Sequence, residues 1–356
     1  MLTSDQQEKE QGREKETVNV AVVGVGAFGR NHARVYHELS KQGKSVRLVG
    51  VADPDISRAD AVAREFGCRG FGSVEQLIST HSEVQAVSVA VPTTQHREVA
   101  GVLMEAGIDV LIEKPVATSV AEADELIEIS RKSGRIAQVG HLERFNPAVR
   151  TTLPLVTQPM FFEVHRLSVF TSRSLDVDVV LDLMIHDLDV VLSWVNSPVR
   201  EIRAVGLPIL SGKVDIANVR AEFESGCVAN FTASRVSTER VRKLRFFQPQ
   251  QYISVDYARQ DVMVFSLRGE GQDLGNPSVN PQINVVKPAV VAEEPLHAEL
   301  KSFLECVRQR SKPVVSLESG RQALSLALEI IRAIQTHSER ADMKNIHASI
   351  LSSTIS

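Results

Sequence analysis

The feature that most constrains the fold is a glycine motif, GVGAFG over Gly24–Gly29, placed between an apolar segment and an amphipathic one. The apolar segment, VNVAVVG from Val18, is typical of a buried strand, and AFGRNHARVYHELS after the first glycines has the periodicity of a helix. Glycines at this spacing permit a tight turn, a close approach of the backbone to a phosphate, and close packing of helix against strand. The motif therefore predicts a strand–turn–helix unit whose helix N-terminus receives phosphate groups.

The same alternation of short apolar runs and longer amphipathic stretches continues as far as Pro147. Further strands are expected over 46–53, 86–92, 109–115 and 135–140, with helices between them. Their runs of Val, Ile and Ala are apolar on both faces, as strands buried in a parallel sheet are. The pattern predicts an α/β domain over residues 18–147, a doubly wound parallel sheet of the Rossmann type.

After Pro147 the apolar and polar residues alternate, in segments such as FFEVHRL, NVRAEFE and KLRFFQ. Alternation predicts an antiparallel sheet with one covered face and one open face. A helix over 181–194 interrupts the strands, a Gly-, Pro- and Asn-rich loop follows at 269–282, and two helices, EPLHAELKSFLECVRQR and SGRQALSLALEIIRAIQ, come last. We expect an α+β domain over 148–346 with a large, open-faced, mostly antiparallel sheet, and a frayed tail over 347–356.

Composition narrows the class of protein. The 356 residues suffice for two domains, and 40 Lys+Arg against 44 Asp+Glu argue against a nucleic-acid binder or a polybasic membrane protein. Three cysteines without a CxxC pair provide neither a disulfide framework nor a zinc site, so no metal is expected. Residues 1–17 are polar, which indicates a disordered tail rather than a signal peptide. With no apolar run of about 20 residues to span a membrane, a cytoplasmic protein is expected.

Asp53 ends the second expected strand, about twenty residues beyond the glycine motif. A carboxylate at this position accepts hydrogen bonds from the adenosine ribose hydroxyls of a dinucleotide and repels a 2′-phosphate, which favours NAD over NADP. Arg58 is close enough in sequence to leave NADP open. The alternative is structural: a glycine turn without ligand, and a strand-end acid that caps the following turn.

Two further groups of residues suggest chemistry. Lys114, in the triplet Glu113-Lys114-Pro115, lies at the carboxyl end of an expected parallel strand, where ligands bind in open α/β sheets. Asp182 and His186 are spaced i and i+4, with Asp189 at i+7, so all three share one face of a helix. A lysine cation stabilises a developing alkoxide, and a carboxylate–imidazole pair suits acid–base work. The alternatives are an ordinary strand end, and a polar stripe on a helix surface.

In combination and in this order, these motifs resemble the Gfo/Idh/MocA oxidoreductases. The resemblance runs from Val18 to about Gln335 and includes VPT followed by a histidine at 91–96, and Gly140 followed by RFNP at 144–147. It implies hydride transfer at a secondary alcohol of a sugar or cyclitol, with tightly held NAD. It also implies that His186 takes the hydroxyl proton, that Lys114 holds and polarises the oxygen, and that Asp182 positions His186 or the substrate.

The resemblance further implies two sets of binding residues. Cofactor contacts are expected from Gly24, Gly26, Ala27, Phe28, Gly29, Asp53, Pro92, Thr93, His96, Glu113 and Lys114. Substrate contacts are expected from Arg144, Asn146, Arg166, Arg173 and His186, with Arg235 and Arg240 as further candidates for phosphate groups. For each arginine of the sheet the alternative is a side chain that faces water.

Within the family, GHLERFNPAV and DVDVVLDLMIHDLDVVLSW resemble the branch that oxidises nucleotide-activated amino sugars. This implies oxidation of the 3-hydroxyl of UDP-N-acetylglucosamine, ahead of a 3-aminotransferase, in the synthesis of diamino-sugar lipid A. Two alternatives stay open: a dehydrogenase of an unactivated cyclitol or sugar, and a non-catalytic NAD-binding regulator. The resemblance also favours a homodimer or homotetramer, for which the open sheet provides a surface.

Overall fold

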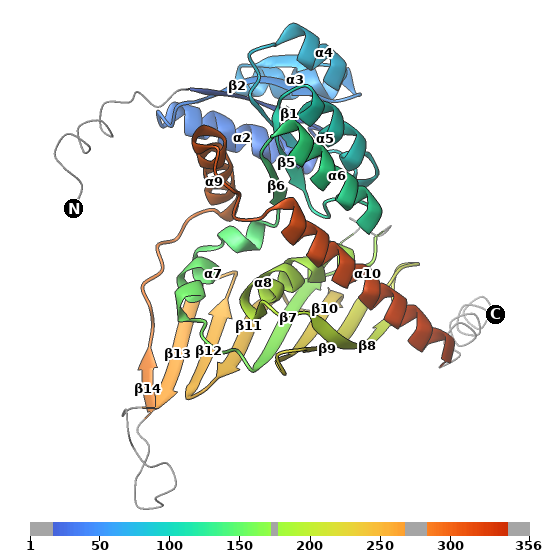
Figure 1. Ribbon diagram of the computed structural model, residues 1–356, viewed down its shortest axis with the longest axis vertical. Helices are drawn as coiled ribbons and strands as arrows, with labels where there is room; N and C mark the ends of the chain where they lie inside the picture. The colour runs from blue at the N-terminus through green and yellow to red at the C-terminus, as the bar shows by residue number, and fades with distance from the viewer. Residues whose placement is uncertain (1–16, 172–176, 268–282, 341–356) are drawn as a thin grey trace, which may run out of the picture. The chain divides into compact units, whose positions relative to one another are not determined.

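The computed structural model describes residues 17–171, 177–267 and 283–340, which are coloured along the chain in Figure 1. The chain divides into two compact units: the residues up to Gly140 with Leu296–Arg321, and His141–Pro295 with the residues from Gln322 onward. Residues 1–16 of the tail expected over 1–17, the expected tail at 347–356, the expected loop at 269–282, and Arg173 lie outside the described residues.

The first unit contains a six-stranded sheet in which every pair of neighbours is parallel. The strands are β1 (Val18–Val23), β2 (Val46–Ala52), β3 (Arg69–Phe71), β4 (Ala86–Val89), β5 (Asp109–Glu113) and β6 (Ala137–Gly140), in the order β3-β2-β1-β4-β5-β6. The order reverses between β1 and β4, which creates the switch point where such sheets bind ligands. The expected doubly wound parallel sheet is confirmed.

The helices of this unit connect consecutive strands and are labelled in Figure 1. They are α2 (Ala27–Lys41), α3 (Ile56–Phe66), α4 (Val74–Thr80), α5 (His96–Glu105) and α6 (Val120–Ser133), with a short 3-10 turn η1 (Thr93–Gln95) before α5. Local chemistry sets several ends: the Ser119 side chain caps α6 at its N-terminus, and Gly134 ends it in the left-handed region. The sequence pattern missed β3 and α4, because three and seven residues are too short to show a period.

The helix α9 (Pro295–Gln309) also packs in this unit, although the sequence pattern assigned it to the second domain. Leu300, Phe303, Leu304 and Val307 form one apolar face that joins the core around β1, β2 and α2. At its C-terminal end, Arg308 donates hydrogen bonds to the main-chain oxygens of two residues between α2 and β2. A segment far along the chain thus completes the first unit.

The second unit contains an eight-stranded sheet in the order β14-β13-β12-β11-β7-β10-β9-β8. Its strands are β7 (Phe161–Val169), β8 (Val199–Leu207), β9 (Ile216–Phe223), β10 (Val228–Ser237), β11 (Val241–Gln248), β12 (Gln251–Asp256), β13 (Asp261–Leu267) and β14 (Ile283–Val286). Six neighbouring pairs are antiparallel, and β7 with β10 is parallel. The expected large, mostly antiparallel sheet is confirmed.

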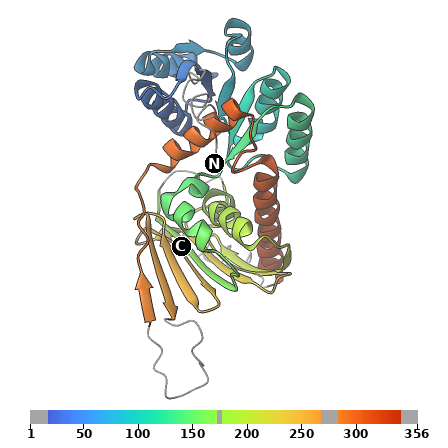
Figure 2. The ribbon, with the colours of Figure 1, turned by 60° about the vertical axis from the view of Figure 1, so that its left-hand side comes forward.

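One face of this sheet is covered by helices, as Figures 1 and 2 show. These are α7 (Pro147–Thr152), α8 (Ile185–Val195) and the part of α10 (Leu317–Arg340) that belongs to this unit. The 3-10 turn η2 (Leu142–Phe145) precedes α7, and the 3-10 turn η3 (Leu153–Leu155) follows it. Phe162, Trp194 and Phe246 pack together on the covered face. Alternate residues of the central strands β7, β9 and β10 are therefore buried, and the residues between them form the open face.

The helix expected over 181–194 begins differently from the expectation. Residues Val180–Met184 form a π turn, η4, in which the amide of Ile185 donates to the carbonyl of Val180, and α8 follows directly. One extra residue in a turn leaves the apolar periodicity almost unchanged, so the sequence pattern does not reveal it. Turns of this kind are frequent at functional sites. Among the described helices, none has the length and apolar character needed to cross a membrane.

Candidate functional site

The glycine motif forms the turn between β1 and α2, and its glycines meet different surroundings. Gly24 has a φ of +80°, and a Cβ there would lie 2.7 Å from the Ala90 carbonyl oxygen. A Cβ on Gly29 would lie 1.7 Å from the Gly24 carbonyl oxygen, which no side chain tolerates. Gly26, by contrast, has no atom within 4 Å of its Cβ position. The motif thus leaves open space beside Gly26 at the N-terminus of α2, where Ala27 and Phe28 are exposed.

Asp53 connects this turn to the end of β2. Its Oδ2 accepts a hydrogen bond of 2.9 Å from the amide of Val25, and its Oδ1 accepts one of 3.0 Å from the amide of Asp55. The Arg58 guanidinium lies 3.3 Å from Oδ1. The Asp53 carboxylate therefore holds the glycine turn in place, and the Arg58 guanidinium lies beside it. In Rossmann sheets the adenosine ribose binds at this position.

His96 holds together the loops that follow β4 and β5. Its Nδ1 lies 2.9 Å from the Pro115 carbonyl oxygen, and its Nε2 lies 3.0 Å from the Val91 carbonyl oxygen. The side chain is buried, and this burial lowers the pKa of His96, against the two carbonyl contacts that raise it. The structure places this expected cofactor residue against main-chain oxygens, while Pro92 is exposed and Thr93 is half-buried.

Glu113, at the end of β5, is held by a histidine that the sequence pattern did not single out. His32 of α2 is fully buried, and its Nε2 lies 3.0 Å from Oε1 of Glu113. Burial by itself raises the pKa of Glu113, but the hydrogen bond and charge of His32, with Lys114 nearby, bring it below the ordinary value. Gly140 makes room for this carboxylate, because a Cβ there would lie 3.0 Å from Oε1. Lys114 itself is half-buried.

In the second unit, the residues expected to carry acid–base chemistry lie on η4 and α8. Asp182 is part of the π turn, His186 is in the first turn of α8, and both are half-buried. The ring of His141 meets His186 edge-on, with centroids 6.2 Å apart. Asp189 is buried, with its Oδ2 3.5 Å from the Arg144 guanidinium. The expected polar face is therefore partly interior to the unit.

Arg166 lies on the covered face of β7, in a cluster of buried charges. Its Nε and Nη2 donate to the two oxygens of Asp187 at 2.7 and 2.9 Å, and its Nη1 donates to Oε1 of Glu143 at 3.0 Å. Burial lowers the pKa of Arg166, but the two carboxylates raise it above the ordinary value, so the guanidinium stays charged. Arg166, expected at substrate phosphates, thus donates to the carboxylates of Asp187 and Glu143. The sequence did not identify these two acids as its partners.

Asn146 belongs to the same cluster. Its Nδ2 donates to Oε2 of Glu143 and to the Tyr257 carbonyl oxygen, each at 3.0 Å, and its Oδ1 accepts from the amide of Ala148 and caps α7. The Tyr257 ring lies under the Arg166 guanidinium, 5.3 Å from ring centroid to Cζ. The side chain expected at the nicotinamide or the substrate is therefore buried within the unit.

The remaining arginine candidates differ in their surroundings. Arg235 is buried, and its Nη2 donates to the carbonyl oxygens of Val177 and Val214. Arg240 is exposed in the turn between β10 and β11. In the parts of the chain that the structure describes, no group of three or more His, Cys, Asp or Glu residues is arranged to hold a metal ion.

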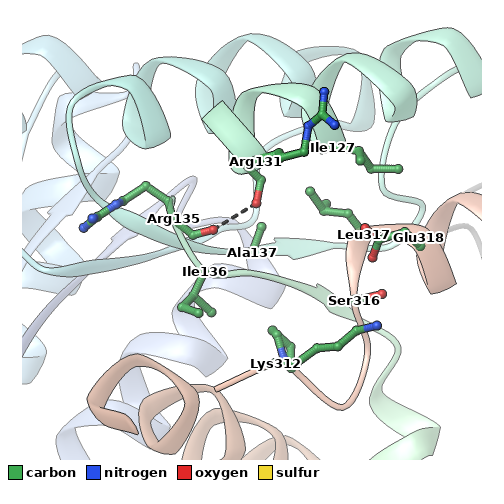
Figure 3. A pocket seen from close by; sticks show the side chains of 11 residues that line it. Ile127, Arg131, Arg135, Ile136, Ala137, Lys312, Ser316, Leu317 and Glu318 are labelled. Carbon is green, nitrogen blue, oxygen red and sulfur yellow. Dashed lines mark hydrogen bonds between the residues drawn. The ribbon is translucent and has the colours of Figure 1, made fainter. Parts of the chain in front are cut away.

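A hollow of about 300 Å³ in the first unit, shown in Figure 3, lies apart from these residues. It is lined from α6, from β6 and from the segment that enters α10, and Ser130 donates a hydrogen bond of 2.9 Å to the Arg135 carbonyl oxygen at its edge. Arg131, Lys312 and Glu318 bring charges of both signs. None of the residues that the sequence singled out lines this hollow.

Two family models match the chain: the oxidoreductase family with NAD-binding Rossmann fold over residues 18–141, and the GFO/IDH/MocA C-terminal domain over residues 155–251. UDP-N-acetylglucosamine 3-dehydrogenase of Acidithiobacillus ferrooxidans is 36% identical over 91% of this chain and 99% of its own length. A solved structure of that enzyme has a TM-score of 0.81 at 34% identity and covers 90% of this chain and 98% of that chain. The scyllo-inositol 2-dehydrogenase (NAD(+)) of Bacillus subtilis is 26% identical over 84% of this chain and 89% of its own length. The chain therefore belongs to the Gfo/Idh/MocA family of oxidoreductases and has the NAD-binding Rossmann domain of that family.

Proposed function

We propose that this chain oxidises the 3-hydroxyl of UDP-N-acetylglucosamine to the 3-keto sugar with NAD as the oxidant. The observation that carries the proposal is the similarity to the enzyme from A. ferrooxidans over nearly the full length of both proteins. The open space at Gly26 suits a pyrophosphate at the N-terminus of α2, and Asp53 suits the adenosine ribose hydroxyls. Pro92, Thr93 and Glu113 complete the proposed cofactor site from the neighbouring strand ends.

Three side chains divide the chemistry in this proposal. When bound, NAD supplies the acceptor for the hydride that leaves C3 of the sugar. His186 accepts the proton of the 3-hydroxyl, and the Lys114 ammonium donates a hydrogen bond to the same oxygen and stabilises its developing negative charge. Asp182 orients His186 or the substrate. One C–H bond and one O–H bond break as the C=O bond forms, and the products are the 3-keto sugar, reduced cofactor and a proton.

The direct test is to incubate the protein with NAD and UDP-N-acetylglucosamine and to follow reduced nicotinamide by its absorbance. A 3-aminotransferase with an amino donor is added to draw the oxidation forward, because it removes the keto sugar. We expect reduced nicotinamide and, in the coupled reaction, a 3-amino sugar nucleotide. Absence of both products in the coupled reaction would contradict the proposal. The same experiment tests whether a 3-aminotransferase acts next on the product.

A second candidate substrate is an unactivated cyclitol, favoured by the similarity to scyllo-inositol 2-dehydrogenase. The same assay with scyllo-inositol and myo-inositol separates the two candidates. A response to inositol alone would replace the first proposal with the second.

The role of Lys114 is tested by Lys114→Met, which removes the cation and keeps an unbranched side chain of similar length. Turnover is expected to fall by a factor of at least about 100, because removal of one group that stabilises the developing charge costs 10²–10³ in kcat. NAD affinity, measured by calorimetry, is expected to change much less. Unchanged turnover would remove Lys114 from the mechanism.

We infer that the open face of the eight-stranded sheet mediates a homodimer or homotetramer. Phe161, Phe247, Tyr252 and Phe265 are paired in register across β7, β11, β12 and β13, with ring centroids 5.0–5.7 Å apart. Such a continuous apolar row in contact with water favours association. Light scattering of Phe247→Asp is expected to report a smaller particle than the wild-type protein. Identical masses would contradict this surface.

The location that this function favours is the cytoplasm, where NAD and nucleotide sugars are available. The three cysteines are free thiols, as expected in a reducing compartment.

A further inference from the structure

The covered face of the second unit contains a buried charge cluster, which we define as Glu143, Arg166 and Asp187. Each of these side chains is 7% exposed or less. The proposed reaction uses none of them, and buried charges are costly unless they are paired and hydrogen-bonded. A role in the protein is therefore required to explain why the cluster is present.

The cluster joins three elements that lie far apart in sequence. Glu143 is in η2, Arg166 is in the middle of β7, and Asp187 is in the first turn of α8. The two hydrogen bonds from Arg166 to Asp187 form a bidentate pair, which fixes the direction as well as the distance of the carboxylate. The third hydrogen bond, to Glu143, ties η2 to the same guanidinium.

The two carboxylates bound by Arg166, those of Asp187 and Glu143, each lie next in sequence to a residue of the proposed substrate site. Asp187 directly follows His186 in α8, so a fixed Asp187 side chain restricts the rotation of the first turn that presents His186. Glu143 directly precedes Arg144 and accepts a hydrogen bond from Asn146. The pair Arg144–Asp189 connects η2 to α8 a second time.

A direct role of Arg166 at phosphate groups is poorly compatible with these contacts. Three of its nitrogens already donate to carboxylate oxygens, and a phosphate brought against the cluster would meet two negative charges for one positive charge. The Arg242 guanidinium, about half exposed, lies 4.0 Å from Oε1 of Glu143 and brings the local charge to balance. The cluster is complete without a ligand.

We propose that Arg166 is a positioning residue, which holds η2 and the first turn of α8 in one arrangement and thereby orients His186 and Arg144 toward the substrate. This inference rests on the proposed function, because it assigns the cluster to the same site. It differs from the expectation from sequence, in which Arg166 contacts the substrate itself.

The first test compares Arg166→Met with the wild-type protein in the dehydrogenase assay. Misplacement of His186 is expected to lower kcat by about 100-fold, with a smaller change in KM for the sugar nucleotide. The deuterium isotope effect on kcat with substrate labelled at C3 is expected to rise, because hydride transfer becomes slower. A large increase in KM at unchanged kcat would instead show that Arg166 binds the substrate.

Two further variants separate orientation from charge and from stability. Arg166→Lys keeps the charge but lacks the planar fork, so it is expected to restore only part of kcat. The triple variant Glu143→Leu, Arg166→Met and Asp187→Leu replaces the cluster by apolar residues and is expected to recover the thermal stability that Arg166→Met alone loses. If kcat recovers together with stability in the triple variant, the cluster serves folding only and the inference is overturned.

The matched control is Arg47→Met, since Arg47 is an exposed strand arginine of β2, outside the eight-stranded sheet, and is paired with Glu83. It is expected to leave kcat, KM and stability unchanged. A readout independent of turnover is the ¹³C NMR spectrum of the protein labelled at histidine, assigned with His186→Gln. The His186 resonance is expected to move or broaden in Arg166→Met and not in Arg47→Met. An unmoved resonance overturns the inference even when the substrate differs from UDP-N-acetylglucosamine, so the two proposals fail separately.

Discussion

At the scale of single residues, the three glycines of the turn after β1 differ in backbone conformation and in the atoms that surround them. Gly24 adopts a positive φ, Gly29 faces a carbonyl oxygen, and Gly26 faces open space. Among these three glycines, only Gly26 could take a Cβ without meeting another protein atom. The sequence motif is uniform, but the structure separates the two glycines that the fold needs from the one that we propose lies against the cofactor.

We expect Gly29→Ala and Gly26→Ala to have different effects. The Cβ in Gly29→Ala overlaps the Gly24 carbonyl oxygen, so the turn must shift and the free energy of unfolding is expected to fall by about 1–3 kcal/mol. The Cβ in Gly26→Ala meets no protein atom, so stability is retained while NAD affinity falls. Thermal denaturation and calorimetric NAD titration of both variants check this contrast. Equal losses of stability would contradict it.

Asp53 and Arg58 present a second distinction at this scale. The Arg58 guanidinium lies beside the Asp53 carboxylate, which is expected to face the ribose of the cofactor, and half of the Arg58 side chain is exposed. A cation in this place reduces the repulsion between the carboxylate and a 2′-phosphate.

Replacement of Arg58 by alanine is therefore expected to weaken NADP binding more than NAD binding. Because the arginine is half exposed, solvent screening limits the change in the ratio of the two dissociation constants to about fivefold. Titration of both cofactors into wild-type protein and Arg58→Ala measures this ratio. A ratio that stays constant would show that Arg58 does not take part in cofactor selection.

At the scale of elements, the segment that carries Lys114 is held from two helices. His32 of α2 contacts the Glu113 carboxylate, and His96 of α5 contacts the carbonyl oxygen of Pro115. The sequence predicted the motif Glu113-Lys114-Pro115 at a strand end, and it predicted His96 as a cofactor residue. It did not predict His32, because a histidine inside a helix has no local signal that identifies its partner 81 residues away.

The lowered pKa of Glu113 predicts a specific acid sensitivity of the first unit. A carboxyl group whose pKa is lowered by folding stabilises the folded protein at every pH above its ordinary pKa of 4.5. This stabilisation is lost as the pH falls through the lowered pKa of the folded state. Glu113→Gln cannot ionise, so its melting temperature is expected to depend less on pH in this acid range. At neutral pH its free energy of unfolding is expected to be lower by about 1.5–3 kcal/mol, the value of a hydrogen bond to a charged group.

Thermal denaturation of wild-type protein and Glu113→Gln between neutral pH and the acid range measures this dependence. Glu128→Gln is a suitable control, because the Glu128 side chain on α6 is about half exposed and pairs with exposed Arg131 in the same helix. Parallel pH profiles for wild-type protein and Glu113→Gln would contradict the assignment.

At the scale of the whole molecule, the position of α9 could not be predicted from its own residues. The spacing of Leu300, Phe303, Leu304 and Val307 indicates an amphipathic helix but does not specify which apolar surface it covers. The structure places it in the core of the first unit. The NAD-binding unit is therefore built from two separate stretches of the chain.

Phe303→Ala is accordingly expected to destabilise the NAD-binding unit. The ring is fully buried, and its removal is expected to cost about 3–5 kcal/mol of unfolding free energy. Chemical denaturation in the presence and absence of NAD measures the change, and Val291→Ala, at a highly exposed residue, is the control. If denaturation of the unit that binds NAD were unaffected, α9 would not belong to its core.

The sequence by itself determined the two sheets, the glycine turn, Asp53 at the end of β2 and the helix that carries His186, because each depends on local periodicity or on a motif of adjacent residues. Tertiary structure alone decided the partners of the buried polar groups. Arg166 resembles any arginine of an alternating strand, and only the arrangement of η2, β7 and α8 places two carboxylates against it. Burial and pairing depend on which elements meet, and this is a property of contacts between residues far apart in sequence.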